Sequence, residues 1–170
     1  MSMILDVGGM KEQFFGGSAM IGIATAYPGF RFCWLLNRHF GTSFANVPEH
    51  TICMGETRSG KDAVKYLGSE VQGSMFGAAP APDGELWYFP TWCHQDPNSG
   101  YSHLLYQLKH GKKVLLPEVK HLDFLWLIQT AEPQHDAHLI LASLRQMPSV
   151  QLAQELTREQ LKKSMANLLL

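Results

Sequence analysis

The sequence predicts a single α+β domain, in which an antiparallel sheet of about five or more strands carries helices mainly on one face. Three observations lead to this prediction. The chain has 170 residues, enough to bury one hydrophobic core. Its middle, over residues 73–130, alternates short apolar runs with turn residues, as an antiparallel meander does. Its last third, from residue 133, changes to helical spacing.

Composition narrows the classes of protein that the chain can represent. Hydrophobic residues make up 45% and charged residues 17%, which excludes a disordered chain. A net charge of −1 offers no electrostatic attraction for a phosphate backbone, so nucleic-acid binding is disfavoured. No secretory signal and no membrane span of about 20 apolar residues is recognisable. The three cysteines are too few and too far apart for a disulfide framework, so we expect a cytoplasmic protein with reduced thiols.

The first third of the chain is predicted to contain a lead, a strand and a helix. Residues 1–16 are expected to be a flexible N-terminal lead, because glycine pairs interrupt them, and residues 17–170 form the domain. Residues 18–26 are predicted as a strand. A helix follows over residues 28–40, with Pro28 in its first turn and Gly41 as its stop. Its apolar face is predicted to comprise Phe32, Leu35, Leu36 and Phe40.

The middle of the chain is predicted to supply the meander. Residues 73–79 lead into a turn, and residues 85–93 form a strand that is bent or ended by Pro90. The next strand has Leu104, Tyr106 and Leu108 on one face. His110 and Gly111 then indicate a tight hairpin, and residues 123–129 form a buried strand.

The last third predicts a strand, helix, strand and helix. A helix is expected from Pro133 to the stop at Pro148, and residues 149–156 alternate as a strand. Residues 157–160, TREQ, match a capping box before a final helix. This order predicts that the C-terminal half is ferredoxin-like.

A phosphate-binding loop is suggested by residues 55–61, GETRSGK, which match G-x-x-x-x-G-K. Such a loop needs Ser or Thr after the lysine, because that hydroxyl coordinates magnesium. Here the next residue is Asp62, whose carboxylate would face the phosphates. We therefore interpret the segment as a surface loop and predict no cofactor.

Two pairs of residues suggest other chemistry. Cys93 and His94 resemble a nucleophile and its base, but neighbouring side chains on a strand point to opposite faces, so a semi-buried structural thiol is favoured. His135 and His138 could share a helix face as metal ligands. No third ligand stands at a sequence spacing typical of metal sites, so we interpret the two residues as ordinary histidines on a helix surface.

Glu118 and Asp123 are the candidate acid and base. Two carboxylates can divide these roles if their environments separate their pKa values. In the favoured structural interpretation, Asp123 accepts hydrogen bonds from backbone N–H groups, while Glu118 pairs with a cation such as Arg31 or a lysine. A catalytic pair would need a pocket that the sequence does not disclose.

The same stretch resembles the signature of the IPExxxVDY family, which comprises small bacterial proteins without an assigned function. Three positions are identical and three are conservative departures: the signature appears as Leu116, Pro117, Glu118, Leu122, Asp123 and Phe124. Phe124 lacks the phenolic hydroxyl of the family's tyrosine. The likeness covers most of residues 20–170 and includes no phosphate loop. It implies a protein partner linked to fatty-acid synthesis or RNA processing.

The sequence therefore supports three hypotheses about function. The leading hypothesis is a non-enzymatic adaptor or regulatory module that acts through protein–protein contacts, with a homodimer as one candidate assembly, because aromatic residues and methionine are abundant. The alternative is a small-molecule-binding domain for an acyl or amino-acid-like ligand, held between sheet and helix. An enzyme using Glu118 and Asp123 is the third and least supported hypothesis.

Overall fold

An antiparallel sheet forms the centre of the computed structural model, which describes residues 7–56, 63–66 and 85–169. Its six strands are β1 (Ala19–Ala24), β2 (Ala45–Asn46), β6 (Thr91–Gln95), β7 (Ser102–Gln107), β10 (Phe124–Gln129) and β11 (Leu152–Leu156). They lie in the order β11-β1-β10-β7-β6-β2, and every neighbouring pair is antiparallel. The predicted α+β class and antiparallel sheet are confirmed.

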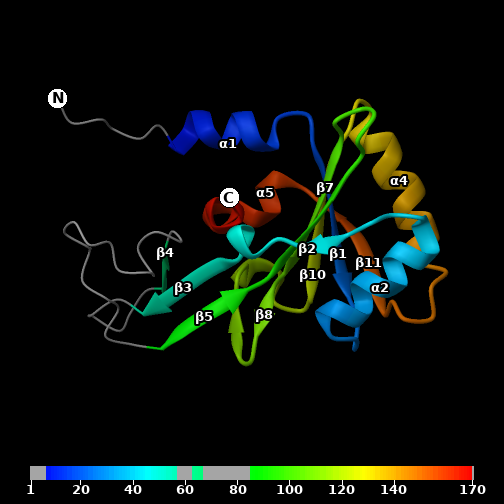
Figure 1. The fold of residues 1–170 in the computed structure, drawn as a ribbon. Coiled ribbons are helices and arrows are strands. Elements are labelled where there is room, and N and C mark those ends of the chain that lie inside the picture. The colour runs from blue at the N-terminus through cyan, green and yellow to red at the C-terminus, as the bar shows by residue number, and fades with distance from the viewer. Residues whose placement is uncertain (1–6, 57–62, 67–84, 170) are drawn as a thin grey trace.

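Two twelve-residue helices, α2 (Gly29–Phe40) and α4 (Pro133–Leu144), cover one face of this sheet (Figure 1). Ile21 of β1 and Trp126 of β10 belong to the same buried cluster as Phe32 and Leu36 of α2 and Leu141 of α4. Pro28 is the N-cap of α2, and Gly41 ends it in the left-handed conformation with φ of 65°. The sequence thus predicted both helices and the buried side of α2.

The opposite face is covered by shorter elements. These are α1 (Val7–Phe15), the 3₁₀ turn η2 (Pro117–Val119), α5 (Arg158–Leu161) and the 3₁₀ segment η3 (Lys162–Leu168). Tyr106 is fully buried here, and its hydroxyl donates a hydrogen bond of 3.0 Å to the carbonyl oxygen of Leu168. At the start of α5, the N–H of Thr157 donates to Gln160 Oε1 at 2.8 Å, which is one half of the predicted capping box.

Residues 1–16 were expected to be a flexible lead, and the structure places α1 within them. Phe15, the last residue of α1, is fully buried in the core on the side of η2 and α5. Arg158 of α5 forms an ion pair with Glu12 of 3.3 Å and also donates to the carbonyl oxygen of Phe15. The apolar pair Phe14 and Phe15 anchors this segment to the core.

A second, three-stranded sheet has the order β4-β3-β5. Its strands are β3 (Ile52–Glu56), β4 (Ala63–Tyr66) and β5 (Leu86–Phe89). The strand predicted over residues 85–93 was expected to be bent or ended by Pro90, and the structure shows that it ends there: Pro90 separates β5 from β6, which lie in different sheets. Gly55 of the phosphate-loop motif lies in β3, whereas residues 57–61 of that motif, the following Asp62 and the predicted segment at 73–79 lie outside the described residues.

Two short elements complete the description. The predicted hairpin joins β8 (Lys109–His110) to β9 (Lys113–Val114), and Gly111 supplies its left-handed residue with φ of 57°. A 3₁₀ turn, η1 (Pro48–His50), precedes β3.

The strand order β11-β1-β10-β7 is that of a ferredoxin-like unit. Strand β1 lies between β10 and β11, which are parallel to each other because each is antiparallel to β1. In the same way β10 lies between β1 and β7. The sequence predicted this pattern for the C-terminal half, and the structure extends it to β1 and α2. The chain between α2 and β7 adds β2 and β6 to the sheet edge and builds the second sheet.

The first residue of α2 is held too closely against the sheet to carry a side chain. A Cβ on Gly29 would overlap Cη2 and Cζ2 of Trp92 and lie 2.8 Å from Gln107 Oε1. We expect Gly29→Ala to lower the free energy of unfolding by about 1–3 kcal/mol, although Ala is the better helix former. Urea unfolding would measure this change. In a Trp92→Phe background the two clashing Trp92 atoms are absent and only the contact with Gln107 Oε1 remains, so the cost should fall; an undiminished cost there would contradict the explanation.

Candidate functional site

Asp123 connects three strands. Its Oδ2 accepts a hydrogen bond from the N–H of Thr25 at 2.9 Å, and its Oδ1 accepts one from Lys109 Nζ at 2.8 Å. Its own N–H donates to the carbonyl oxygen of Ile23, and its carbonyl oxygen accepts from the N–H of Leu108, both at 2.8 Å. Asp123 therefore joins the end of β1 to β10 and to the chain that follows β7. It lines a cavity of about 330 Å³ beside the start of α2 with both carboxylate oxygens engaged.

Glu118 is exposed on η2, where the hydroxyl of Ser164 in η3 donates a hydrogen bond to its Oε2. Arg31 was an expected partner of Glu118. In the structure the Arg31 guanidinium lies over the ring of Tyr27 instead. The two candidate carboxylates thus have separate partners in separate elements. This arrangement favours structural roles for both residues.

The other residues of the family-like signature occupy structural positions. Leu116 and Leu122 are buried on the face of the sheet covered by η2 and α5, and Phe124 is buried on the face covered by α2 and α4. Pro117 opens η2. The signature therefore spans the point at which the chain turns from one layer of the fold into the next.

The structure does not bring the candidate metal ligands or the candidate nucleophile and base together in a site. His135 and His138 are both exposed on α4. Among the described residues no group of three or more His, Cys, Asp or Glu is placed to hold a metal ion. Cys93 packs toward the core beside η2, and burial raises the pKa of its thiol, whereas His94 stacks on His103 on the other face of the sheet. The alternation of a strand separates this pair as predicted.

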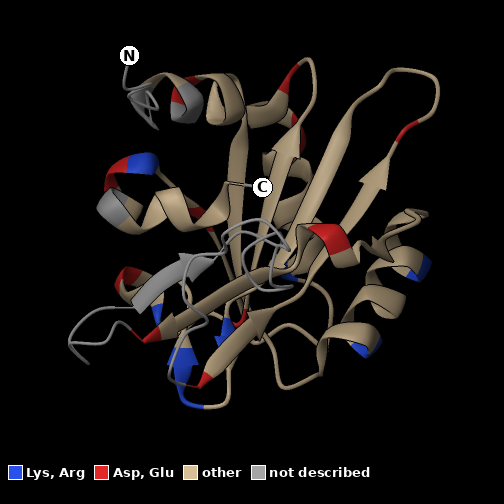
Figure 2. Ribbon diagram, turned by 60° about the vertical axis from the view of Figure 1, so that its left-hand side comes forward, with Lys and Arg blue, Asp and Glu red and all other residues tan. Residues whose placement is uncertain are grey.

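The outward side of α2 carries the most exposed aromatic side chains among the described residues. Phe30 is 75% exposed and Trp34 is 56% exposed, one helical turn apart. The guanidinium of Arg38 lies over the ring of Trp34, 5.5 Å from its centre, and that of Arg31 lies over Tyr27 at 4.6 Å. We call these five residues the α2 surface. Basic but no acidic residues occur along α2 (Figure 2).

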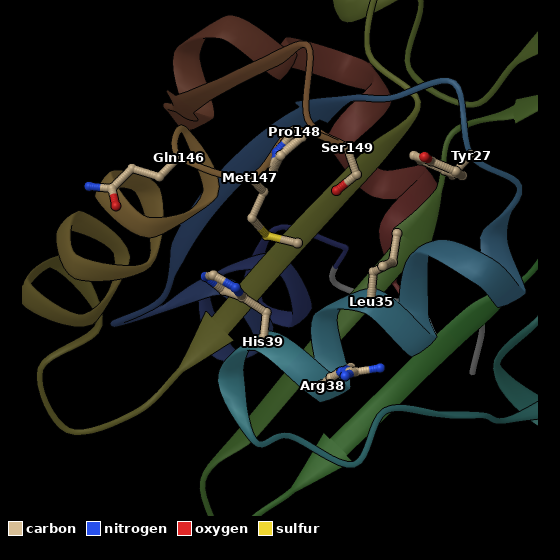
Figure 3. Close-up of a pocket in the computed structure, with 8 residues that line it drawn as sticks. All are labelled: Tyr27, Leu35, Arg38, His39, Gln146, Met147, Pro148 and Ser149. Atoms are coloured by element: carbon tan, nitrogen blue, oxygen red, sulfur yellow. The ribbon is translucent and has the colours of Figure 1, made fainter.

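A cavity of about 510 Å³, here the Met147 cavity, adjoins the α2 surface. It lies between α2 and the chain that follows α4 (Figure 3). Figure 3 shows Met147 reaching toward Leu35 and His39 of α2. Tyr27 and Arg38 belong both to this cavity and to the α2 surface, so the two features form one continuous region.

A second cavity is lined by residues of both long helices. It measures about 460 Å³, and we call it the Trp126 cavity. Its lining is Phe40, Thr42, Tyr101, His103, Trp126, Thr130, Asp136, Leu139 and Ile140. His39 of α2 and Ser143 of α4 form a hydrogen bond of 2.8 Å that connects the two helices.

Sequence reasoning did not identify the α2 surface or either cavity. A usable signal was present for the first: Phe30 and Trp34 are four residues apart and lie outside the predicted apolar face of the helix. The cavities gave no such signal, because their walls come from distant parts of the chain. His39 and Ser143, for example, are separated by 104 positions.

The fold and these features define an α+β protein with a ferredoxin-like strand order and an exposed aromatic and basic helix. No family model matches the chain, no curated protein matches it, and no solved structure matches it. Within the described residues, the helices are all too short or too polar to cross a bilayer.

Proposed function

We propose that this protein is a non-enzymatic cytoplasmic adaptor or regulatory module that binds an acidic segment of another protein through its α2 surface. The observation that carries the proposal is the exposure of Phe30 and Trp34, flanked by Arg31 and Arg38. Tryptophan, tyrosine and arginine are the residue types that most often dominate binding energy at protein interfaces.

The two aromatic rings supply apolar area that a partner can bury. A phenylalanine or tryptophan side chain offers about 150–250 Å². At about 25 cal/mol per Å², even partial burial of both rings contributes several kcal/mol toward association. Because Phe30 and Trp34 lie on a regular helix, little backbone ordering is needed when a partner binds.

The charge of the α2 surface indicates the chemistry of the partner. Neither Arg31 nor Arg38 has an ion pair within the part of the chain that the structure describes. Each guanidinium is held over an aromatic ring and keeps its hydrogen-bond donors available to a carboxylate. An acidic partner segment would complement both cations, and its affinity should fall as salt is added.

The Met147 cavity supports a defined mode of contact. Leu35 and Met147 line it, and so do Tyr27 and Arg38, which also belong to the α2 surface. An apolar side chain of the partner could enter this cavity while neighbouring acidic residues meet the arginines. Methionine suits such a role because its flexible side chain adapts to the group that it contacts.

The resemblance to the IPExxxVDY family leads us to propose a partner in fatty-acid synthesis or RNA processing. The enzyme hypothesis has less support, because Glu118 and Asp123 are engaged by different groups. The small-molecule alternative is favoured by the Trp126 cavity between sheet and helices, which is a separate feature of the fold.

Substituting Trp34 tests the adaptor proposal. We expect Trp34→Ala to weaken partner binding at least about thirtyfold, since a central aromatic anchor contributes about 2 kcal/mol or more. A partner captured by the wild-type protein would be identified, purified and titrated calorimetrically against both forms. Leu139→Ala is the matched control, because Leu139 has the same 56% exposure on the neighbouring helix. The control should stay within about twofold of wild type.

Two results would contradict the proposal. One is a reconstituted complex that forms equally well with Trp34→Ala. The other is a wild-type homodimer, detected by light scattering, that Trp34→Ala dissociates; a second copy would then cover the α2 surface in place of an acidic partner. Thermal melts of Trp34→Ala should match wild type, because an exposed side chain contributes little to folding.

A further inference from the structure

We propose that the Trp126 cavity binds a small organic ammonium ion, with the charge beside Asp136 and the apolar body among the aromatic side chains. This site is distinct from the α2 surface, so the inference does not rest on the proposed adaptor function. It specifies the ligand chemistry that this part of the fold recognises.

The walls of the cavity come from four places in the chain. Phe40 is the last residue of α2, Tyr101 precedes β7, Trp126 is in β10, and Leu139 is on α4. The rings of Phe40 and Trp126 meet edge to face, with centres 5.4 Å apart and planes at 90°. The face of an aromatic ring is electronegative and attracts an ammonium group, so a lining with several aromatic side chains favours a cation.

Asp136 supplies the charge. It lies in the first turn of α4, and its Oδ2 accepts a hydrogen bond from the hydroxyl of Thr130. That bond fixes the orientation of the carboxylate. The cavity lining contains Asp136 as its acidic residue and contains neither lysine nor arginine. An ammonium ion would therefore be attracted into the cavity, whereas a carboxylate or phosphate would be repelled.

His103 is the remaining titratable nitrogen base in the lining, and it does not oppose a cation. The indole Nε1–H of Trp126 can only donate, so the bond of 3.1 Å to His103 Nδ1 makes that nitrogen the acceptor. Burial, with a smaller contribution from the charge on His94, lowers the pKa of His103 to about 4. At neutral pH His103 is uncharged, so Asp136 is the charged side chain of the lining.

The volume of about 460 Å³ matches a small ligand. The probe we select is phenethylamine, a primary ammonium ion at neutral pH with one aromatic ring. Its uncharged counterpart is 2-phenylethanol, which has the same shape and lacks the positive charge. The difference between the two isolates the contribution of Asp136 from that of the apolar walls.

Isothermal titration of the full-length protein with these probes tests the proposal. We expect one phenethylamine to bind per chain, at least about tenfold more tightly than 2-phenylethanol. Asp136→Asn should weaken phenethylamine at least about tenfold, because asparagine keeps the bond to Thr130 and loses the charge. Glu132→Gln removes an equal charge from the exposed N-cap of the same helix, outside the cavity, and should change affinity less than about twofold.

Tyr101→Ala provides a second variant, since Tyr101 is 39% exposed at the rim and its loss leaves the charge in place. It should weaken both probes by a similar factor. The proposal is overturned if phenethylamine shows no saturable binding at about 10 mM, if 2-phenylethanol binds equally well, or if Asp136→Asn binds phenethylamine as wild type does. Trp34→Ala should bind phenethylamine normally, which separates this outcome from a failure of the adaptor proposal.

Discussion

Asp123→Ala is expected to lower the free energy of unfolding by about 2–3 kcal/mol. The substitution leaves the N–H of Thr25 without its acceptor, and Thr25 is only 6% exposed. A buried donor without a partner costs about 1–3 kcal/mol. Loss of the ion pair to Lys109 adds less than about 1 kcal/mol, because both groups are partly exposed to solvent.

Glu118→Gln is the control for this prediction. Its carboxylate is exposed and accepts from the hydroxyl of Ser164, and glutamine can accept the same hydrogen bond. Its stability should stay within about 0.5 kcal/mol of wild type. Urea unfolding of the two variants beside the wild-type protein measures both changes. If Asp123→Ala unfolds at the same urea concentration as the wild-type protein, the carboxylate is not structural and the enzyme hypothesis gains support.

Acid is expected to destabilise the fold through His103. Burial, followed by the charge on His94, lowers the pKa of His103 from 6.5 to about 4, although Asp136 acts in the opposite direction. Below pH 6.5 the unfolded chain takes up a proton at this residue, whereas the folded protein does not until about pH 4. The contribution of the neutral His103 to folding stability is thus fully present above pH 6.5 and is lost as the pH falls from 6.5 to about 4. The loss reaches at most about 3 kcal/mol.

His103→Asn tests this acid dependence. The Oδ1 atom of asparagine can accept from the indole N–H of Trp126 in place of Nδ1, and asparagine does not titrate. The wild type should therefore lose more stability than the variant as the pH falls from about 7 to about 4, so that its unfolding free energy minus that of the variant decreases. His135→Asn, at an exposed position of α4, controls for the removal of one histidine and should retain the wild-type acid dependence. A difference that stays constant over this range would show that His103 is not the responsible group.

Much of the local structure follows from the sequence by itself. Pro28 and Gly41 bound α2, Gly111 forms the predicted hairpin, and the alternation of Leu104, Tyr106 and Leu108 places all three in one buried cluster. Each of these features depends on neighbours within a few positions, because helix spacing, strand alternation and left-handed turns are local properties of the chain. The family-like signature likewise marked Asp123, whose partners the sequence could not supply.

Tertiary structure alone decided which surfaces remain open. The periodicity of α2 predicted its buried side, but the exposure of Phe30 and Trp34 depends on no other element covering them. The Trp126 cavity joins residues from α2, β7, β10 and α4 only because β10 lies beside β7 and both long helices cover the same face. Contacts between residues far apart in sequence arise from strand order and layer packing, and no local pattern encodes these. The sequence therefore determined the two long helices, most strands of the six-stranded sheet and the buried side of α2, and the packing of those elements determined the sites.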